Sequence, residues 1–343
     1  MTDPTPQQMH LINHSDLQAF VEAILLGNGT PPANAAIVAQ CLVAADLRGV
    51  DTHGSNRIPS YMERIRQNAL DARAQPTLRQ VTPVAAQVDG RNGFGFVAAH
   101  TAMDAAIRMA REFGMGMVSV KHSNHFGMSA WVVRQALDAG MMSLVFTNSS
   151  PALPVWGGRE KLMGVSPIAC GAPSGDPRRP FILDMAPSVA ARGKIYKALR
   201  RGEKIPEDWA LDQDGARTDD PARALEGVML PMGGPKGSAL SIMMDVFSGG
   251  VLRGGVCGAC DESPDLFMSM EEFQGRMDYL YKRVVESEKM AGVDRIYFPG
   301  EIEMITEEQR REKGIPFAAS EIASLNQEAD RVGIAHLKVQ SSN

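Results

Sequence analysis

Apolar residues in the first half of the chain switch repeatedly between strand-like and helical spacing, and this alternation restricts the fold more than any other feature. The strand-like runs cover residues 83–90, 114–123 and 141–149, and the helical runs cover residues 93–114 and 128–140. Strands that alternate with helices along a chain are typical of α/β proteins. We therefore expect an α/β (α+β) fold with a sheet domain in the middle of the sequence.

The first eighty residues show helical spacing instead. The run Ser15-Asp-Leu-Gln18 is typical of a helix start, because its first and last side chains can cap backbone N–H groups. A second helix is predicted after Thr30-Pro-Pro, since proline fits the first helical turn. A third helical run ends before the two prolines of residues 72–83. We place a domain boundary near residue 80.

The second half of the chain predicts one further strand and several helices. The strand covers residues 180–187, and the helical runs cover residues 239–252, which should be buried, residues 270–289, and a polar tail from about residue 301. At 343 residues the chain is long enough for two or three domains. We expect a helical domain over 1–80, an α/β domain over 81–300, and helices over 301–343 that pack back on the N-terminal domain.

Charge and hydropathy exclude several classes of partner. The 35 basic and 40 acidic residues give a net charge of −5 without a basic stripe, so no nucleic acid partner is expected. The first twenty residues are polar and unlike a signal peptide, and no apolar run is long enough to cross a membrane. Four cysteines are too few for a disulfide scaffold, which indicates a reducing, cytoplasmic location.

Two motifs that often bind metals or cofactors are incomplete. Cys257 and Cys260 have the spacing of zinc ligands, but no further thiolate or imidazole lies nearby, so two small buried residues are the better interpretation. The run Gly93-Phe-Gly95-Phe-Val-Ala98 matches a dinucleotide fingerprint between a strand and a helix. The acidic residue that should follow about twenty positions later is missing. Glycines of a tight turn would explain the same spacing.

The run Lys121-His-Ser-Asn-His125-Phe-Gly lies where a predicted strand passes into a helix, the usual place for active groups in α/β folds. Without a carboxylate close by, His122 and His125 make an incomplete metal site, and two hydrogen-bonded turn histidines are another interpretation. A histidine beside a glycine turn suits proton transfer, because its ordinary pKa lies near neutral pH. We favour His125 as the general acid or base.

The run HGSNRIPSY places His53, Arg57 and Tyr61 at steps of four with no acidic residue among them. Pro59 is tolerated only in the first turn of a helix, so that helix should begin near residue 55 or 56. His53 and Arg57 would then lie at a helix N-terminus, which favours anions, and arginine can hold a carboxylate at two points. Surface charge with a hydrogen-bonded histidine is the alternative.

Two further polar residues decide nothing by themselves. Gly233-Gly-Pro-Lys236-Gly lacks the spacing of a Walker motif, yet its lysine could meet a phosphate or a carboxylate, or simply be solvated. Asp184 ends a predicted strand and suits either a ribose hydroxyl or a helix N-cap.

Seven segments, taken together and in order, carry a resemblance to a known family. They are DTHGSNR, HSNHFG, FTNSSP, GVSPIACGAP, LDMAPSVAARGK, GGPKG and IYFPGE. With them the chain resembles, over nearly its whole length, the type 2 malate/L-lactate dehydrogenase family. That family also contains sulfolactate and ureidoglycolate dehydrogenases and reductases of piperideine-2-carboxylate and pyrroline-2-carboxylate.

The resemblance implies a homodimeric nicotinamide dehydrogenase whose cofactor-binding sheet domain, residues 81–300, is not a Rossmann fold. It also implies that the N- and C-terminal segments form one helical domain. The glycine run at Gly93 is then no phosphate loop. Between Ser248 and Met270 the chain is shorter than the family pattern, which has a longer loop and a further strand there. Either the sheet is trimmed or a mobile segment is missing from the chain.

The family's functional residues carry over by resemblance. His125 matches the catalytic histidine, and His53, Arg57 and Tyr61 match the substrate pocket, where an acid would repel the bound carboxylate. The positions that match contacts to NAD or NADP are Ser149, Asp184, Met185, Ala186, Lys236, Arg276, Met277, Gly300, Glu301, Ile302, Glu303, Met304 and Ile305. Ser150 is expected near the pocket.

The expected reaction transfers hydride between nicotinamide C4 and C2 of a small 2-hydroxy or 2-oxo carboxylate of the malate or lactate type. His125 would exchange a proton with the C2 oxygen, while Arg57 holds the carboxylate. The alternative within the family is reduction of a cyclic or N-alkyl imine carboxylate. From other classes, a non-catalytic carboxylate-binding protein and a metal-dependent hydrolase using His122 and His125 stay open. The sequence does not decide between NAD and NADP.

Overall fold

A computed structural model describes residues 9–245, 247–248, 259–262, 269–286, 294–295, 297–298 and 300–339. These residues form two compact units, and we describe each by itself. Unit 1 contains the described residues of Val145–Ala169 and Asp184–Gly258. Unit 2 contains the described residues of Pro6–Leu144, Cys170–Leu183 and Ala259–Asn343.

Unit 2 begins with a short strand and a group of helices. These elements are β1 (Met9–Ile12), α1 (His14–Gly27), α2 (Pro32–Leu47), the short 3-10 helices η1 (Asp51–His53) and η2 (Ser55–Arg57), and α3 (Ile58–Arg66). The cap of α1 is Asn13, whose side chain accepts hydrogen bonds from the backbone N–H groups of Ser15 and Asp16. The predicted start at Ser15 is therefore wrong, because Asn13 already satisfies the first turn.

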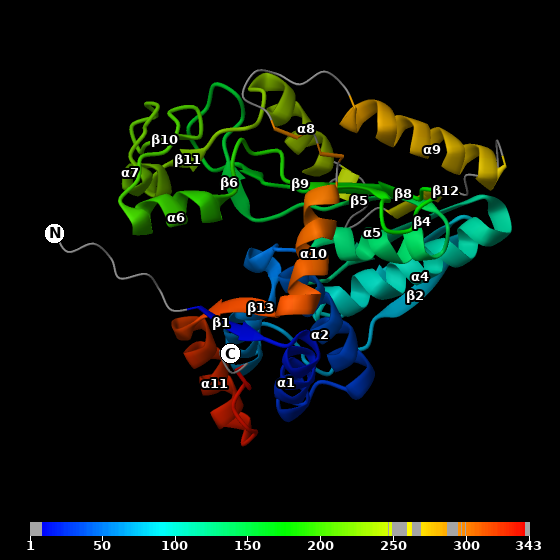
Figure 1. Cartoon of the computed structure of the whole chain (residues 1–343), viewed down its shortest axis with the longest axis horizontal. Helices are drawn as coiled ribbons and strands as arrows, with labels where there is room; N and C mark the ends of the chain where they lie inside the picture. The colour runs from blue at the N-terminus through cyan, green and yellow to red at the C-terminus, as the bar shows by residue number, and fades with distance from the viewer. Residues whose placement is uncertain are drawn as a thin grey trace. The chain divides into compact units, whose positions relative to one another are not determined.

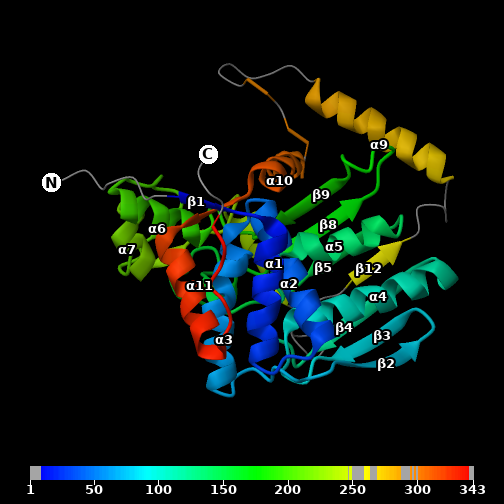
Figure 2. The same ribbon diagram turned by 60° about the horizontal axis from the view of Figure 1, so that its bottom comes forward.

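The main sheet follows, and among the described residues it has seven strands in the order β2-β3-β4-β12-β5-β8-β9. Their bounds are β2 (Thr77–Thr82), β3 (Ala85–Asp89), β4 (Met115–Lys121), β12 (Ala259–Glu262), β5 (Met142–Phe146), β8 (Ile168–Ala172) and β9 (Phe181–Met185). Strands β3 and β4 are parallel, and helix α4 (Gly95–Phe113) connects them and packs beside them (Figure 2). Helix α5 (Ser129–Asp138) connects β4 to β5. The predicted alternation of strands and helices is confirmed here.

Three strands of this sheet, β2, β8 and β12, were not predicted, and β8 lies between β5 and β9. Strand β2 covers residue 80 and pairs with β3 in an antiparallel hairpin, so the proline-containing segment does more than end a helix. Strand β12 lies between β4 and β5 and is antiparallel to both. The short stretch before Met270 therefore still contributes a strand to the sheet. Cys257 lies outside the described residues, as does the side chain of Cys260.

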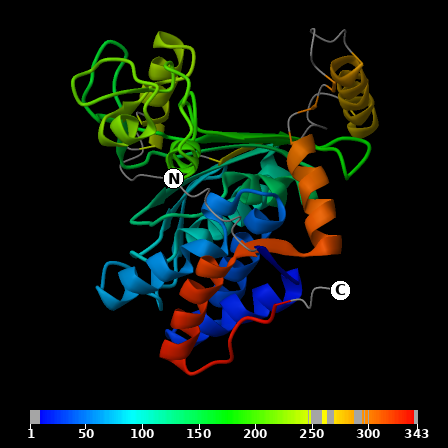
Figure 3. The same ribbon diagram turned by 60° about the vertical axis from the view of Figure 1, so that its left-hand side comes forward.

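The C-terminal part of unit 2 contains α9 (Met270–Val285), α10 (Glu301–Lys313), β13 (Ile315–Ala318) and α11 (Ala319–Val332). Strand β13 pairs with β1 in an antiparallel register that places Phe317 opposite His10 (Figure 1). The expectation of a purely helical tail is wrong at this strand. In Figure 3 the orange helix α10 continues through β13 into the red helix α11.

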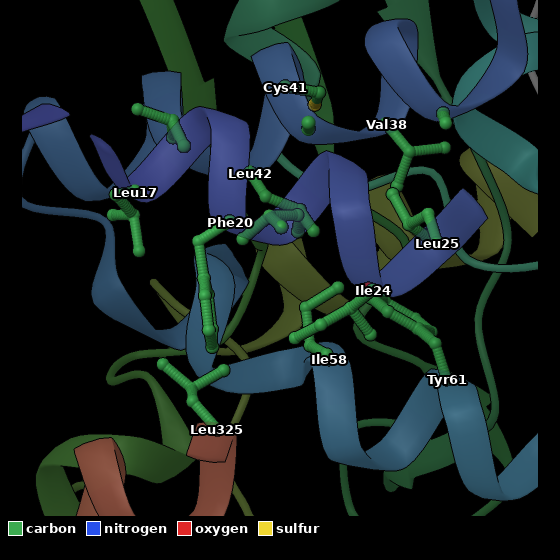
Figure 4. Close-up of a cluster of buried hydrophobic side chains, with 14 of the residues drawn as sticks. Leu17, Phe20, Ile24, Leu25, Val38, Cys41, Leu42, Ile58, Tyr61 and Leu325 are labelled. Carbon is green, nitrogen blue, oxygen red and sulfur yellow. The ribbon is translucent and has the colours of Figure 1, made fainter. Parts of the chain in front are cut away.

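The N- and C-terminal segments of unit 2 share one hydrophobic core. Phe20, Ile24 and Leu42 of the first two helices pack with Leu325 of α11, and Tyr61 lies at the edge of the same cluster (Figure 4). Arg66 of α3 forms an ion pair with the buried Glu328 of α11, with an N–O distance of 2.8 Å. The chain's two ends are therefore joined both by apolar burial and by a charge-assisted hydrogen bond.

Unit 1 contains the shorter elements. They are β6 (Pro151–Leu153), β7 (Met163–Gly164), α6 (Arg192–Arg201), β10 (Ala210–Leu211), α7 (Pro221–Glu226), β11 (Val228–Met229) and α8 (Pro235–Asp245). Its core includes Leu153, Ile195 and Met229. Helix α8 begins four residues earlier than predicted, and Ile242 and Met243 are exposed, so the prediction of a buried helix there is only partly right.

At the level of fold class, the expected mixture of helices and sheets is confirmed. None of the helices in the described part of the chain is long and apolar enough to cross a membrane.

Candidate active site

The run His53 to Tyr61 forms a compact turn that leads into α3. His53 ends η1, and Gly54 separates it from η2, which ends at Arg57. Helix α3 then begins at Ile58, with Pro59 in its first turn. The predicted helical start near residue 55 is confirmed, because a 3-10 turn begins there before the α-helix proper. Arg57 occupies the N-cap position, one helical turn before Tyr61.

His125 lies in the loop that connects β4 to α5. Two glycines allow this loop to adopt its conformation close to α4. A Cβ on Gly95, the first residue of α4, would lie 2.0 Å from the Asn124 carbonyl oxygen and 2.7 Å from that of His125. Gly127 has a φ of +81° and packs against the ring of Phe96. Gly95 therefore lets α4 approach the His125 loop, which gives the glycine run a physical reason other than phosphate binding.

The structure brings together three of the four residues predicted for the reaction centre by direct contact. The Tyr61 hydroxyl hydrogen-bonds Nδ1 of His125 at 2.7 Å. The rings of His53 and His125 stack with their centroids 5.4 Å apart and their planes inclined by 21°. Phe96 meets the Tyr61 ring edge-on at 5.6 Å and supports the cluster from behind. The two imidazole rings and the phenol ring thus pack together in one cluster.

Arg57, the fourth predicted residue, adds positive charge to this cluster. It lies close enough to Tyr61 to lower the pKa of that hydroxyl by charge and hydrogen bonding, although burial dominates and raises the Tyr61 pKa overall. Tyr61 therefore keeps its proton at neutral pH. The Nε atom of Arg57 is buried and has no hydrogen-bond partner among the described residues. A buried guanidinium N–H without an acceptor is suited to receive a carboxylate oxygen.

The same surroundings favour the neutral form of both histidines. One edge of His125 is exposed, but the protein around its other sides withdraws it from water and lowers its pKa well below 6.5. The repulsion that His53 would exert if both rings were protonated, and the charges of Arg57 and Arg64, lower it further, while water on its exposed side screens part of these effects. The pKa of His53 is also lowered, first by burial and then by Arg57.

Arg64 and Asn124 hold the His125 loop in place, and neither was singled out from the sequence. Arg64 of α3 donates a hydrogen bond to Oδ1 of Asn124 at 2.9 Å. The Asn124 side-chain amide in turn donates to the carbonyl oxygens of Asn92 at 3.1 Å and Gly93 at 2.9 Å. Arg64 follows Tyr61 by three positions on one helical face, which is the signal that could have found it.

His122 lies apart from this cluster. Its Nδ1 atom is 3.1 Å from both carboxylate oxygens of Asp89, and Lys121 lies 3.8 Å from the same carboxylate. The expectation that no carboxylate lies near these histidines is therefore wrong, since β3 brings Asp89 alongside β4. No group of three metal-binding side chains occurs within the described residues.

In unit 1, two of the segments with predicted cofactor contacts are connected to α8 or to the turn before it. Oγ of Ser149 accepts a hydrogen bond from the Ser166 N–H at 3.3 Å, and the Ser149 backbone packs tightly on Gly164. The hydroxyl of Ser241 in α8 donates to the Gly164 carbonyl oxygen at 3.4 Å. Ser149 and its exposed neighbour Ser150 are thereby connected to α8.

The segment Asp184 to Ala186 is connected to the turn that precedes α8. The Pro187 carbonyl oxygen, just after Ala186, accepts a hydrogen bond from the Met232 N–H at 2.9 Å. Met232 precedes the two left-handed glycines that turn the chain into α8 at Pro235. Lys236 is exposed in the first turn of α8, where no acidic residue occurs. Ser149, the segment 184–186 and Lys236 therefore all belong to unit 1.

The remaining predicted cofactor residues belong to unit 2. Gly300 caps α10 with a φ of +91° and packs against Ile182 of β9. Glu301 is committed to local contacts, because it accepts hydrogen bonds from the Tyr281 hydroxyl at 3.1 Å and the Phe298 N–H at 3.0 Å. Ile302 is exposed, and Glu303 and Ile305 are half-buried.

Met304 and Arg276 differ in how firmly they are held. The sulfur of Met304 accepts a hydrogen bond from Arg48 at 3.3 Å, which ties α10 to the end of α2. Arg276 is exposed on α9 beside the half-buried Met277. Its guanidinium pairs with Glu272 at 2.6 Å.

Comparison with known proteins identifies the family. The sequence profile of malate/L-lactate dehydrogenase matches residues 12–326. The chain belongs to the malate/L-lactate dehydrogenase family. Malate dehydrogenase of Pyrococcus abyssi is 36% identical over 352 residues, which cover 96% of each chain. The Delta(1)-pyrroline-2-carboxylate reductase of Ancylobacter novellus is 36% identical over 68% of this chain and 69% of its own.

Solved structures of this dehydrogenase family agree in fold. The crystal structure of malate dehydrogenase from Entamoeba histolytica matches with a TM-score of 0.90 and 28% identity, over 96% of this chain and 99% of that one. The resemblance seen in the seven sequence segments is thereby confirmed, as is the expectation of an NAD(P)-dependent oxidoreductase.

Proposed function

We propose that this protein transfers hydride between NAD or NADP and C2 of a small 2-hydroxy or 2-oxo carboxylate of the malate or lactate type. The observation that carries the proposal is the hydrogen bond between Tyr61 and His125, within a cluster that also holds His53 and Arg57. A proton-transfer group and a carboxylate-binding group within one cluster are the two parts that this reaction needs.

Arg57 would bind the substrate carboxylate. Its buried Nε–H lacks a partner among the described residues, and a guanidinium can hold both carboxylate oxygens. His53 would hydrogen-bond the reacting oxygen or the carboxylate through Nε2, because its Nδ1 already meets the Thr52 hydroxyl at 2.9 Å. Within the described part of the chain, no acidic side chain is among the charges that act on the two histidines, so the anion is not repelled.

His125 would exchange the proton with the C2 oxygen. Since Tyr61 occupies Nδ1, the nitrogen left for the substrate is Nε2. A tyrosine hydroxyl can both donate and accept, so it can accompany Nδ1 in either protonation state of the imidazole. Tyr61 would therefore orient His125 throughout the reaction.

The substrate's own charge would adjust the pKa of His125. In the free protein, burial and then the positive charges of Arg57 and Arg64 oppose protonation of His125, so it is ready to act as a base on a 2-hydroxy acid. A carboxylate bound to Arg57 offsets part of that charge and raises the pKa of His125. In the reductive direction, binding of the 2-oxo acid would thus favour uptake of the proton that the product needs.

The residues proposed to hold the nicotinamide cofactor fit it to different degrees. When bound, the cofactor supplies or accepts the hydride. The start of α8, with exposed Lys236 and no acidic residue in its first turn, suits a phosphate group. The first turn of α10 carries Glu301 and Glu303, which suit hydroxyl or amide groups of the cofactor better than phosphate. Ser149, the segment 184–186 and Arg276 would complete the set.

The domain organisation and assembly are part of the proposal. We infer a non-Rossmann cofactor-binding sheet domain over residues 81–300, with a helical domain formed by residues 1–80 and 301–343. The shared core of the N- and C-terminal segments supports that helical domain. We also propose that the protein is cytoplasmic and forms a homodimer. Sedimentation of the purified protein tests whether it is a dimer.

The test is consumption of reduced nicotinamide by the purified protein, with NADH and NADPH in parallel. The 2-oxo acid substrates are oxaloacetate, pyruvate and sulfopyruvate. The imine substrates are piperideine carboxylate and the imine formed from pyruvate with methylamine. Turnover of an oxo acid that is lost in His125→Ala, while cofactor binding persists, is the expected result. Near-normal turnover in that variant would refute the role of His125, and silence on every substrate would refute the function.

The second candidate is reduction of a cyclic or N-alkyl imine carboxylate. The neutral state of His125 favours it, because a protonated imine brings its own proton and needs less from the protein. The similarity to a pyrroline-2-carboxylate reductase supports it as well. Turnover of imines alone, with weak dependence on His125, would select this branch.

A further inference from the structure

Asp46 is a buried acid that the proposed reaction does not use directly. It lies in the last turn of α2 and is only 2% exposed. One carboxyl oxygen, Oδ2, accepts a hydrogen bond from the Ser55 N–H at 2.8 Å. The other, Oδ1, would lie 1.7 Å from a Cβ placed on Gly54. The carboxyl therefore lies directly against the Gly54–Ser55 peptide. Along the chain, this peptide separates His53 from Arg57.

That peptide fixes how the two substrate-binding side chains are presented. His53 ends η1 and Arg57 ends η2, so the backbone between them determines the relative direction of both helical turns. The Ser55 N–H is the first donor of η2, and Asp46 satisfies it in place of a local cap. Gly54 has an extended conformation that other residues can adopt, so the lack of space beside Asp46 is what requires glycine.

Asp46 also contacts α10 through its main chain. Its carbonyl oxygen accepts a hydrogen bond from Arg310, and Arg310 pairs with the Asp51 carboxylate of η1 at 2.5 Å. Side chain and main chain of one residue thus join the substrate turn to the helix proposed to contact the cofactor. A buried carboxyl is costly to desolvate, and an apolar residue would stabilise α2 more cheaply.

We propose that Asp46 is a positioning residue, whose carboxyl holds the Gly54–Ser55 peptide so that His53 and Arg57 face the same substrate carboxylate. The inference rests on the proposed function for its kinetic readout. It assigns Asp46 no contact with the substrate or the cofactor.

Kinetics of Asp46→Ala and Asp46→Asn test the proposal. Removing the carboxyl should raise KM for the 2-oxo acid roughly 10- to 100-fold, because small displacements of binding groups are costly, with a smaller change in kcat. Asparagine keeps an acceptor oxygen for the Ser55 N–H, so that variant should stay within about threefold of wild type. Asp51→Asn, which weakens the Arg310 pair and leaves the Asp46 carboxyl against the Ser55 N–H, is the control and should also stay close to wild type. A role in stability alone would lower Tm and leave KM unchanged in all three.

A double-mutant cycle with Gly54 gives a second readout. Gly54→Ala alone should raise KM, because its methyl group collides with the carboxyl. In Asp46→Ala that space is open, so adding Gly54→Ala should cost no more than about threefold extra. Additive losses, or a wild-type KM in Asp46→Ala, would overturn the proposal.

The same variants separate this proposal from the proposed function. If the wild-type protein oxidises no reduced nicotinamide with any substrate, the proposed function fails. Binding of pyruvate and of oxaloacetate, measured by calorimetry, then replaces KM in the cycle. Weaker binding in Asp46→Ala that Asp46→Asn restores would support the positioning role, and equal or absent binding in all variants would reject it.

Discussion

At the scale of single residues, the hydroxyl of Tyr61 contributes through its hydrogen bond to His125. In Tyr61→Phe, Nδ1 of His125 loses its 2.7 Å partner and keeps the longer contact from the Gly127 N–H at 3.4 Å, while the ring keeps its contacts with Phe96. We expect kcat to fall roughly 10- to 100-fold, because a reacting group that loses its orientation is costly, and only a small fall in Tm, because one hydrogen bond contributes about 1 kcal/mol net. Steady-state kinetics and calorimetric unfolding measure both. Unaltered kcat would show that His125 needs no orientation by Tyr61.

The pKa of His125 predicts a second effect at this scale. A histidine with an ordinary pKa near 6.5 would lose its free base, and kcat/KM for a 2-hydroxy acid would fall, as the pH drops below that value. Burial and the neighbouring positive charges lower the pKa of His125, so the neutral base persists. We therefore expect kcat/KM to stay flat between pH 7.5 and about 5.5. A decline centred near pH 6.5 in that range would contradict this.

Single residues also mark the limit of what sequence could predict. His53, Arg57 and Tyr61 were predicted as one cluster because their spacing is local. The Tyr61–His125 hydrogen bond joins residues 64 positions apart, so only family resemblance related them in advance. Asp46 gave no signal, because a carboxyl in an apolar helix is recognised only when its partner, the Ser55 N–H, is known.

At the scale of elements, the approach of α4 to the His125 loop depends on Gly95. In Gly95→Ala the new methyl would collide with backbone carbonyl oxygens, which cannot move as a flexible side chain can. We expect about 1–3 kcal/mol of destabilisation and at least a tenfold loss of kcat/KM. Gly275→Ala on α9 is the matched control, since nothing lies within 4 Å of its added Cβ. Denaturant titration and steady-state kinetics of both variants test this prediction. Equal stability and equal kcat/KM in the two variants would contradict a role of Gly95 in the approach of α4 to the His125 loop.

Elements were predictable where their spacing was local and regular. The helices over 95–113 and 270–285 and the strands over 115–121 and 142–146 matched periodic apolar runs. Strands β2, β8 and β12 were missed, because β2 is exposed along its whole length, β8 consists mostly of small residues, and β12 has four residues. Each becomes a strand through hydrogen bonds to a distant partner rather than through its own pattern.

At the scale of the whole chain, closure of the two ends supports the site. Strand β13 pairs with β1, and Arg66 of α3 meets the buried Glu328 of α11. Because α3 also carries Tyr61 and Arg64, the C-terminal segment stabilises the helix that supports His125. The resemblance implied such a return of the tail, whereas the tail's own polarity could not specify the strand.

Stability of the whole protein should depend on pH through Asp46. Burial is the main cause that raises the pKa of its carboxyl to about 7, from 3.8, and the Asp51 charge adds to this, while Ser55 and Arg310 oppose it. Between these two values the unfolded state is ionised and the folded state holds the proton, so the free energy of unfolding falls as pH rises from 4 to 7. Above pH 7 both states are ionised and this dependence ends.

Asp46→Asn removes that titration. Relative to this variant, wild type should lose stability on going from pH 4 to pH 7, by up to about 4 kcal/mol for three pH units. Other groups, His125 among them, titrate alike in both proteins and cancel in the difference. Urea unfolding of wild type and variant at half-unit pH steps measures it. A difference that is constant over this range would mean that Asp46 is ionised in the folded protein, with water or Arg310 compensating its charge. A gradual change in the difference in free energy of unfolding that ends near pH 7 would show that the Asp46 carboxyl, beneath the His53–Arg57 turn, is protonated in the folded protein below that pH.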